Sequence, residues 1–337
     1  MDMGYQQVIT CTGFGGTGSS AISDFLKEFD NVKSLGDFEF SLAHEVDGIS
    51  DLQHGIVDDF HRNKTSETIY RFRQLTKKLA KTYNQYFENQ FSEVIEDYLQ
   101  EIVQYKWKGF WHQHIYRSGI IKKYIFYIIP YILQYRLGNM FSKTGYEFVP
   151  KMPFQTMEIG RGENRFFNAT QNLYEKLFSI INPDNEYKYL HLDQLVPPHN
   201  YDRYLKYFHN LKVVQVDRDP RDLYLLNELF WHEGWIPSRN ATEFVEWFKL
   251  IRSEKKTKVE NPNIIKIKFE DIVYDYDETT DSLISFLGLD KTMHSNRKKY
   301  FDPDISKKNT LLWKKFKGRE VEIEYIEKHL NSYCYGL

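Results

Sequence analysis

The chain has 337 residues, which is enough to bury a substantial core in one large α/β domain or in two average domains. Its 45 basic and 47 acidic residues leave a net charge of -2, which excludes the overall positive field that proteins use to bind nucleic acid. Two cysteines, Cys11 and Cys334, exclude a disulfide framework and predict a reducing compartment. The opening MDMGYQQVIT runs directly into a predicted strand, so we expect no signal peptide and a cytoplasmic protein.

The first forty residues predict the start of an α/β domain. A strand (VITC, 8–11) leads into a glycine-rich loop, and the helix SSAISDFL (19–26) follows it. A second short strand is predicted within NVKSLGDFEF (31–40). This order of strand, loop, helix and strand is typical of the first unit of a parallel sheet.

The next hundred residues predict a helical insertion, 66–165. Apolar residues recur at helical spacing from Ser66 to about Tyr105, with Thr65 or Ser66 as the cap, and this predicts one long helix. The following segment, 106–165, is irregular and rich in aromatic residues. We expect this insertion to recognise a substrate.

From residue 170 onward helices and strands alternate. Helices are predicted at 170–181, 201–208, from Arg221, at 241–256 and at 277–289, and strands at 187–196, 211–217 and 264–269. The alternation predicts an α/β fold with a largely parallel sheet and helices on both faces. We therefore expect a single domain, 1–337, that carries the helical insertion.

The glycine loop has three interpretations with a ligand and one without. Gly13, Gly15 and Gly18, with Asp37 about twenty residues further on, match the Rossmann dinucleotide pattern. The same glycines match the first part of a Walker A loop, but Ser19 stands where that loop has its lysine. A loop that binds a phosphosulfate through backbone N–H groups, hydroxyls and a helix N-terminus needs no lysine. A plain turn that packs a strand on a helix is the interpretation without a ligand.

A cluster of charge follows the predicted strand 211–217. Arg218 comes directly after this strand, at the edge where α/β folds bind ligands, and its planar guanidinium suits a phosphate. Pro220 starts the next helix. Arg221 and Asp222 are equally well explained as a salt-bridge cluster that caps this helix.

Four segments in this order resemble the sulfotransferases that use 3′-phosphoadenosine 5′-phosphosulfate (PAPS). They are GGTGSSAISDFL, VVQVDRDPRDLYLL, KFEDIVYDYDETTDSLISFLGL and SKKNTLLWKKF. The resemblance implies a P-loop-like parallel sheet and PAPS as the donor, with no metal. It also implies that Arg218 binds the 3′-phosphate and that the 5′-phosphosulfate lies in a loop made of Gly15, Gly16, Thr17, Gly18, Ser19 and Ser20.

The chain departs from the family pattern at two positions. The family usually has a lysine or arginine two residues before the loop glycine that Gly18 matches, where this chain has Gly16. It often has a serine eight residues after the arginine, where this chain has Leu226 beside Asn227, so Asn227 is the substitute candidate. In the basic segment near the C-terminus, the resemblance implies that Lys308 and then Lys307 reach the 3′-phosphate, although a solvated lysine pair is an equal alternative.

Sulfuryl transfer to a hydroxyl benefits from a base, which this family usually supplies as a histidine or a glutamate. The stretch LGDFEFSLAHE offers two carboxylates on one strand face, Asp37 and Glu39, followed by His44 and Glu45. We expect Glu39 to be the base, with Asp37 as second choice. Lys143, Lys151 and Arg161 are candidates for the positive charge that the loop lacks, without a ranking.

The sequence thus predicts a cytoplasmic PAPS-dependent sulfotransferase whose acceptor is a carbohydrate hydroxyl, an expectation that rests on family analogy. Two alternatives stay open: an NAD(P)-dependent Rossmann enzyme, and a non-catalytic protein that binds a nucleotide or a glycan on a sulfotransferase scaffold. We expect no nucleic-acid partner. The acceptor is a small molecule or a glycan.

One apolar segment, 119–137, points to a surface role. Its core YIFYIIPYIL is interrupted by Pro130 and is too short to span a bilayer, and Lys122, Lys123 and Arg136 flank it. Such a segment suits a helix that lies on a membrane, at the inner face for a cytoplasmic protein. A buried insertion helix and a dimer contact are the alternatives.

Overall fold

The computed structural model describes residues 5, 7–111, 113–133, 135–136, 153–253 and 261–336, with the side chain of Asp37 excepted. The chain divides into two compact units, one made of 1–45 with 174–337 and the other of 46–173. Helix α9 (Glu163–Ile181) runs across the sequence boundary between them. The insertion predicted at 66–165 falls within the second unit.

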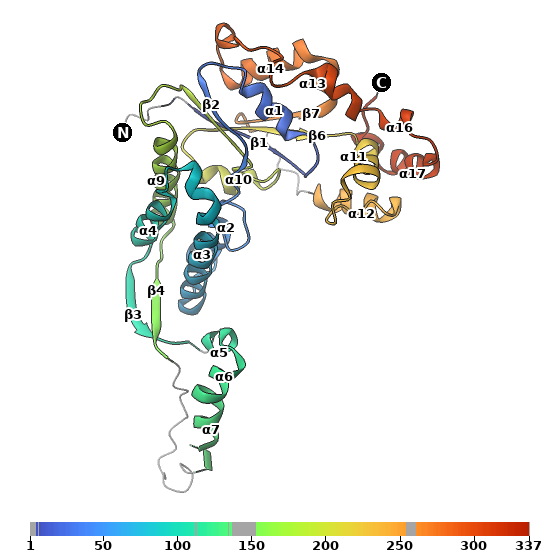
Figure 1. Ribbon diagram of the computed structural model, residues 1–337. Coiled ribbons are helices and arrows are strands. Elements are labelled where there is room, and N and C mark those ends of the chain that lie inside the picture. The colour runs from blue at the N-terminus through green and yellow to red at the C-terminus, as the bar shows by residue number, and fades with distance from the viewer. Residues whose placement is uncertain are drawn as a thin grey trace. The chain divides into compact units, whose positions relative to one another are not determined.

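The first unit is built on a five-stranded parallel sheet (Figure 1). Its spatial order is β2-β5-β1-β6-β7, so β1 is central and has parallel partners on both sides. The predicted fold class, a parallel α/β sheet flanked by helices, is confirmed. The strands are β1 (Gln7–Gly13), β2 (Val32–Glu39), β5 (Tyr189–Asp193), β6 (Leu211–Asp217) and β7 (Ile264–Lys268).

The strand order bears on the Rossmann alternative. In the two common doubly wound folds the second strand lies directly beside the first. Here β5 lies between β1 and β2, and β2 pairs only with β5 among the described strands. The sheet therefore does not have the order of a dinucleotide-binding Rossmann fold.

Two hydrophobic clusters hold the helices of the first unit, and the first of them packs helices on the sheet. The first joins one face of β1 and β6 to α1 (Ser19–Leu26), α13 (Phe269–Tyr274) and α14 (Tyr276–Leu287), as Figure 1 shows. Phe25 and Leu283 are fully buried there, and burial of each such side chain contributes about 2 kcal/mol. The second cluster joins α11 (Pro220–Leu226), α12 (Ala241–Ile251) and α17 (Glu320–Leu330).

Short elements complete the first unit. They are α10 (Tyr201–Tyr204), η5 (Leu205–Tyr207), η6 (Asn227–Trp231), η7 (Lys291–Met293), α15 (Pro303–Ser306), η8 (Lys307–Asn309), α16 (Leu312–Lys315) and η9 (Asn331–Tyr333).

The second unit is helical with one ribbon. The single long helix predicted from residue 66 to 105 is wrong, because α3 (Arg62–Tyr83) and α4 (Phe91–Ile102) are separate. Glu88 and Asn89 adopt positive φ angles between them, which a continuing right-handed helix does not allow. Helix α3 begins four residues before the predicted start, and His61, not Thr65 or Ser66, is its cap.

The segment that follows α4 contains a ribbon that the sequence did not predict. Strands β3 (Tyr105–Gly109) and β4 (Gln155–Ile159) pair in antiparallel register. Short helical elements stand between them in sequence: α5 (Gln113–Arg117), α6 (Ile120–Lys123), η3 (Tyr124–Ile128) and α7 (Ile129–Leu133). Before α3 lie α2 (Ile49–Gln53) and η1 (His54–Asp58), and η2 (Asn84–Tyr86) follows it. No helix of the described residues is long and apolar enough to span a bilayer.

Candidate functional site

The candidate site lies at the edge of the sheet where the parallel strands end. Backbone pairing sets Glu39 opposite Asp193 and Asp217 opposite Lys268, and Gly13 at the end of β1 lies beside β6. The polar ends of β2, β5, β6 and β7 therefore lie at the same edge as the glycine loop that follows β1. Ligands of open α/β sheets bind at this edge.

The loop backbone requires glycine at three positions. Gly15, Gly16 and Gly18 have positive φ angles of 85°, 65° and 94°. A Cβ on Gly15 would lie 2.0 Å from the Trp235 indole, and one on Gly16 would lie 2.8 Å from the Trp231 indole. The space that the missing lysine or arginine would need at Gly16 is thus partly filled by Trp231.

The N-terminus of α1 follows this loop with unoccupied hydrogen-bonding capacity. Gly18 is the N-cap residue and supplies no side-chain cap, so the first N–H groups of α1 have no capping side chain. Thr17 is buried, and its Oγ1 has no hydrogen-bond partner among the described residues. Since buried polar groups are normally paired, this arrangement fits an anion held by the loop.

Arg218 is a buried cation that the structure connects to the loop through Phe269. It is 4% exposed at the end of β6, and its guanidinium lies 4.5 Å from the centre of the Phe269 ring. The same Phe269 ring packs against Gly18, since a Cβ there would lie 2.5 Å from it. Arg218 forms no ion pair with a described residue, and its Nε has no hydrogen-bond partner among them. A buried guanidinium without an ion-pair partner suits a phosphate.

Three buried carboxylates surround Arg218. Asp219 accepts hydrogen bonds from the backbone and side chain of Arg221, so this arginine belongs to the cap of α11 and to an ion pair of 2.6 Å. Burial raises the pKa of Asp222 to about 6, and burial raises the pKa of Glu270 to about 7. Glu270 is therefore partly neutral near pH 7, which weakens its repulsion of an anion at Arg218, whereas Asp222 stays mostly ionised and accepts backbone N–H groups.

The basic segment near the C-terminus reaches this cluster through its backbone. The carbonyl of Asn309 accepts a hydrogen bond from Nη2 of Arg218, and the N–H groups of Leu311 and Leu312 each donate to Asp222 at 2.7 Å. Lys307 is exposed and pairs with Asp304 at 2.6 Å, whereas Lys308 is exposed with no described ion pair. Lys307 and Lys308 thus belong to the same short helix as Asn309, whose carbonyl contacts Arg218.

Asn227 has a structural role in its own turn. Its Nδ2 lies within hydrogen-bonding distance of the carbonyls of Glu233 and Ile236 and of Oγ of Ser238, and its Oδ1 accepts from the N–H of Glu233. The amide is buried and both of its ends are occupied. These contacts fix the turn that carries Trp231 and Trp235. The side-chain amide of Asn227 therefore has no free donor for the phosphate contact that was predicted for it.

The predicted bases stand at the end of β2. Glu39 is exposed there, and the side chain of Asp37 lies outside the described residues. His44, in contrast, is tied to the loop through Gln194: Nε2 of His44 lies 2.8 Å from the carbonyl of Gln194. The Gln194 side chain contacts Oγ1 of Thr12 at 3.3 Å and Oγ of Ser19 at 3.5 Å.

This geometry fixes the proton on His44. Because a carbonyl oxygen only accepts, Nε2 carries the hydrogen and Nδ1 keeps its lone pair. Burial lowers the pKa of His44, so the ring is neutral at pH 7 and can accept a proton at Nδ1. The sequence offered His44 but favoured Glu39. Gln194 was missed, because the predicted strand 187–196 ran past the true end of β5 at Asp193.

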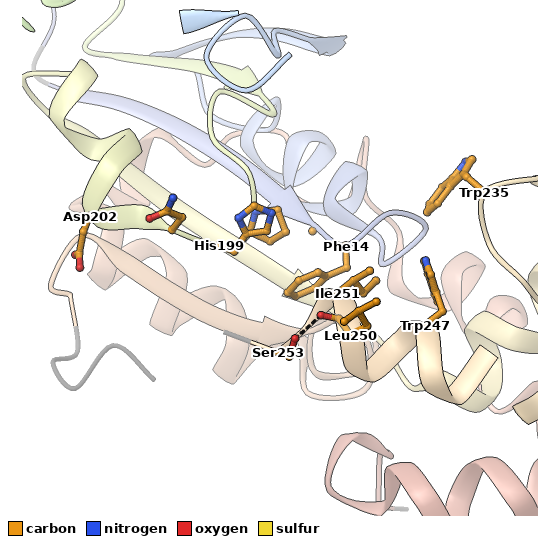
Figure 2. A pocket seen from close by; sticks show the side chains of 11 residues that line it. Phe14, His199, Asp202, Trp235, Trp247, Leu250, Ile251 and Ser253 are labelled. Atoms are coloured by element: carbon orange, nitrogen blue, oxygen red, sulfur yellow. Dashed lines mark hydrogen bonds between the residues drawn. The ribbon is translucent and has the colours of Figure 1, made fainter. Parts of the chain in front are cut away.

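A pocket of about 870 Å³ opens beside the loop (Figure 2). Figure 2 shows Trp235 and Trp247 toward one end, Phe14 between, and His199 and Asp202 toward the other. Apolar faces with a few polar groups are typical of a small-molecule site. The full lining is Gly13, Phe14, Pro198, His199, Asn200, Asp202, Trp235, Trp247, Leu250, Ile251 and Ser253.

The three candidates for the missing loop cation belong to the second unit. Lys143 and Lys151 lie outside the described residues. Arg161 belongs to the second unit, where its guanidinium lies 4.7 Å from the centre of the Phe60 ring and its N–H donates to Gln104. Among the described residues, no three His, Cys, Asp or Glu side chains are grouped as metal ligands.

Of the comparisons with known proteins, only the comparison with solved structures gives matches. No known family profile matches the chain, and no curated protein matches it. The sulfotransferase domain from the Synechococcus PCC 7002 olefin synthase is 11% identical, with 98% of this chain and 95% of that one covered and a TM-score of 0.40. The sulfotransferase domain from the curacin biosynthetic pathway is 12% identical, with 99% of both chains covered and a TM-score of 0.39.

A third solved structure, sulfotransferase STF1 from Mycobacterium tuberculosis H37Rv, is 14% identical, with 92% of this chain and 78% of that one covered and a TM-score of 0.32. All three are sulfotransferases, the family that the sequence motifs resemble.

Proposed function

We propose that the protein transfers a sulfuryl group from PAPS to a hydroxyl group of a carbohydrate. The observation that carries this proposal is the pair of anion sites at one edge of the sheet. One is the cation-free glycine loop at the N-terminus of α1, and the other is the buried Arg218, which forms no ion pair with a described residue. PAPS has a 5′-phosphosulfate and a separate 3′-phosphate, so one donor fits both sites. A triphosphate would need the lysine that Ser19 replaces.

The fit to this donor rests on two buried polar atoms. Oγ1 of Thr17 and Nε of Arg218 are buried and lack partners among the described residues. A bound anion would accept a hydrogen bond from each of them. The loop from Gly15 to Ser20 would hold the phosphosulfate and Arg218 the 3′-phosphate, with Lys307 and Lys308 closing from the C-terminal segment. When bound, PAPS supplies the sulfuryl group and a leaving phosphate.

The residues of the chain would act by position and charge. The N–H groups at the start of α1 stabilise the negative charge that develops on the leaving phosphate. His44, held by Gln194, accepts the proton of the acceptor hydroxyl at Nδ1. Glu39 at the end of β2, which the sequence favoured as the base, is the second candidate for this role.

The acceptor pocket supports a carbohydrate. Trp235 and Trp247 offer apolar faces to a sugar ring, and His199, Asn200 and Asp202 offer hydrogen bonds to its hydroxyls. This pocket shares Gly13 and Phe14 with the loop region, so an acceptor in it would lie next to the donor. The cytoplasm stays the predicted compartment.

Calorimetry with adenosine 3′,5′-bisphosphate, NAD and ATP tests the donor site. We expect binding of the bisphosphate and at least tenfold weaker binding in Arg218→Lys, which keeps the charge but loses the two-pronged contact. Exposed Lys206→Gln is the control variant. NAD binding without bisphosphate binding would reject the proposal.

A second variant separates ligand binding from folding. Thr17→Val removes the unpartnered hydroxyl at nearly constant volume, so we expect unchanged or slightly higher stability together with weaker bisphosphate binding. A stable variant that binds as the wild type does would show that this hydroxyl contacts no ligand.

A sulfate-transfer screen over glycans then divides an enzyme from a binding protein. We expect His44→Gln to abolish transfer while bisphosphate affinity stays, and Glu39→Gln to keep activity. The reverse outcome would return the base to Glu39. Bisphosphate binding with no transfer to any glycan would favour the non-catalytic alternative.

A further inference from the structure

An exposed apolar helix stands in the second unit, formed by α6, η3 and α7 and here called the apolar helix (120–133). None of its described side chains is buried. Ile120 and Ile121 are 75% and 76% exposed, and Tyr124 and Ile125 are about half exposed. A buried insertion helix is therefore excluded, and an exposed apolar surface of this extent marks an interaction site.

The exposed isoleucines form one face of the helix. Ile121, Ile125 and Ile129 recur every four residues, which places them on one helix face. Ile132 extends this face, whereas the stacked rings of Tyr131 and Tyr135 lie on an adjoining side of the helix, and all three side chains are exposed. Isoleucine and tyrosine together suit the boundary between lipid headgroups and acyl chains.

The charge on the segment has one sign. Residues 113–136 contain no aspartate or glutamate. Arg117 pairs with Glu67 at 3.3 Å and lies over the Tyr70 ring, so its charge is already compensated. Lys122 and Lys123 are exposed and form no ion pair with a described residue. An anionic surface is the complementary partner.

A second copy of the chain fits this surface less well. A two-fold symmetric interface sets the same patch against itself, so the lysines of one copy would face the lysines of the other with no carboxylate on the patch to compensate them. A bilayer with anionic headgroups accepts both the isoleucines and the lysines.

We infer that the apolar helix (120–133) binds the surface of anionic membranes. It lies flat in the headgroup region, with its isoleucines and tyrosines toward the acyl chains and with Lys122 and Lys123 on lipid phosphates. The inference does not depend on the proposed transferase activity, because it uses a surface of the second unit alone.

Vesicle flotation of the full chain tests this inference. The vesicles contain phosphatidylcholine alone or with about 30% phosphatidylglycerol. We expect flotation with the anionic vesicles only, and less of it as salt rises. Lys122→Gln/Lys123→Gln should bind about thirtyfold more weakly, and Ile121→Ser/Ile125→Ser at least about tenfold more weakly.

Matched controls keep the test specific. Lys77→Gln/Lys78→Gln removes two adjacent exposed lysines of α3, and Val46→Ser/Val321→Ser removes two exposed aliphatic side chains. Both controls should float like the wild type. Since all of these side chains are exposed, each variant should keep the thermal stability of the wild type.

Three outcomes would overturn the inference. One is no flotation with either vesicle. Another is flotation that the substitutions in the apolar helix leave unchanged. The third is a protein that does not float but self-associates in sedimentation experiments without lipid. If Ile121→Ser/Ile125→Ser abolished this self-association, the surface would be assigned to a second copy of the chain.

Discussion

Replacement of Glu270 by glutamine tests the electrostatic account of the donor site. Glu270 is fully buried, its Oε1 accepts from the N–H of Asp219 at 3.1 Å, and its Oε2 has no partner among the described residues. Burial raises the pKa of Glu270 from an ordinary value of 4.5 to about 7. Glutamine keeps the shape and the acceptor oxygen but cannot ionise.

The sign of the effect follows from proton linkage. Between pH 4.5 and 7 the unfolded chain has ionised this carboxyl while the folded protein still holds the proton, so stability falls as pH rises and levels off above pH 7. A shift of this size corresponds to about 3 kcal/mol of unfolding free energy. The glutamine variant lacks this loss, and its advantage over the wild type should grow from near zero at pH 4.5 to about 3 kcal/mol at pH 8.

Urea unfolding at a series of pH values measures this difference. Glu278→Gln, at an exposed position of α14, is the control and should follow the wild type at every pH. The same Glu270→Gln protein should bind adenosine 3′,5′-bisphosphate more tightly above pH 7, because it has lost a negative charge near Arg218. A constant stability difference between pH 4.5 and 8 would refute the reasoning.

Two further substitutions test the loop and its supporting turn. Gly18→Ala should cost several kcal/mol in thermal unfolding and weaken bisphosphate binding, because its Cβ would lie 2.5 Å from the Phe269 ring at a φ of 94°. Gly288→Ala is the control with positive φ and open space, so it should cost only about 1 kcal/mol, and equal costs would contradict the close packing at Gly18. Asn227→Ala removes the amide contacts that hold this turn and leaves the N–H of Glu233 without its acceptor, so it should cost about 2 to 3 kcal/mol in urea unfolding. A loss of bisphosphate affinity at unchanged stability would instead indicate that Asn227 contacts the ligand.

The parallel sheet could be predicted because its strands are short apolar runs bounded by turns. The strand predicted at 211–217 matches β6 in both bounds, and Arg218 follows it at the edge of the sheet where the parallel strands end. Strand order could not be predicted, since periodicity carries no information on which strands pair. The position of β5 between β1 and β2 emerged only from backbone pairing.

Local exceptions in backbone conformation account for other differences. The break between α3 and α4 depends on positive φ angles at Glu88 and Asn89, which interrupt an apolar pattern that is otherwise continuous. The β3–β4 ribbon joins segments that are distant in sequence. The residues of β3 are exposed or half-buried, so β3 lacks the alternation of buried and exposed side chains that marks a strand on a core. Neither feature follows from short-range preferences.

The candidate site was predicted best where a motif fixes the backbone and worst where a side chain chooses among partners. The glycines of the loop were correctly placed at the end of β1 because a positive φ favours glycine. Asn227 and His44 were ambiguous, because an amide or an imidazole bonds whatever the fold brings near it. The contacts of Asn227 within its turn and of His44 with Gln194 required the folded chain.

The central place of β1 has a consequence for synthesis of the chain. Strand β1 pairs with β5 and β6, and β2 pairs with β5, so neither of the first two strands has its partner until Tyr189 and the residues after it have left the ribosome. At ordinary translation rates this delay is on the order of ten to forty seconds. The apolar strand VITC therefore spends that time as an unpaired edge, and the nascent chain should be most sensitive to chaperone loss in this interval.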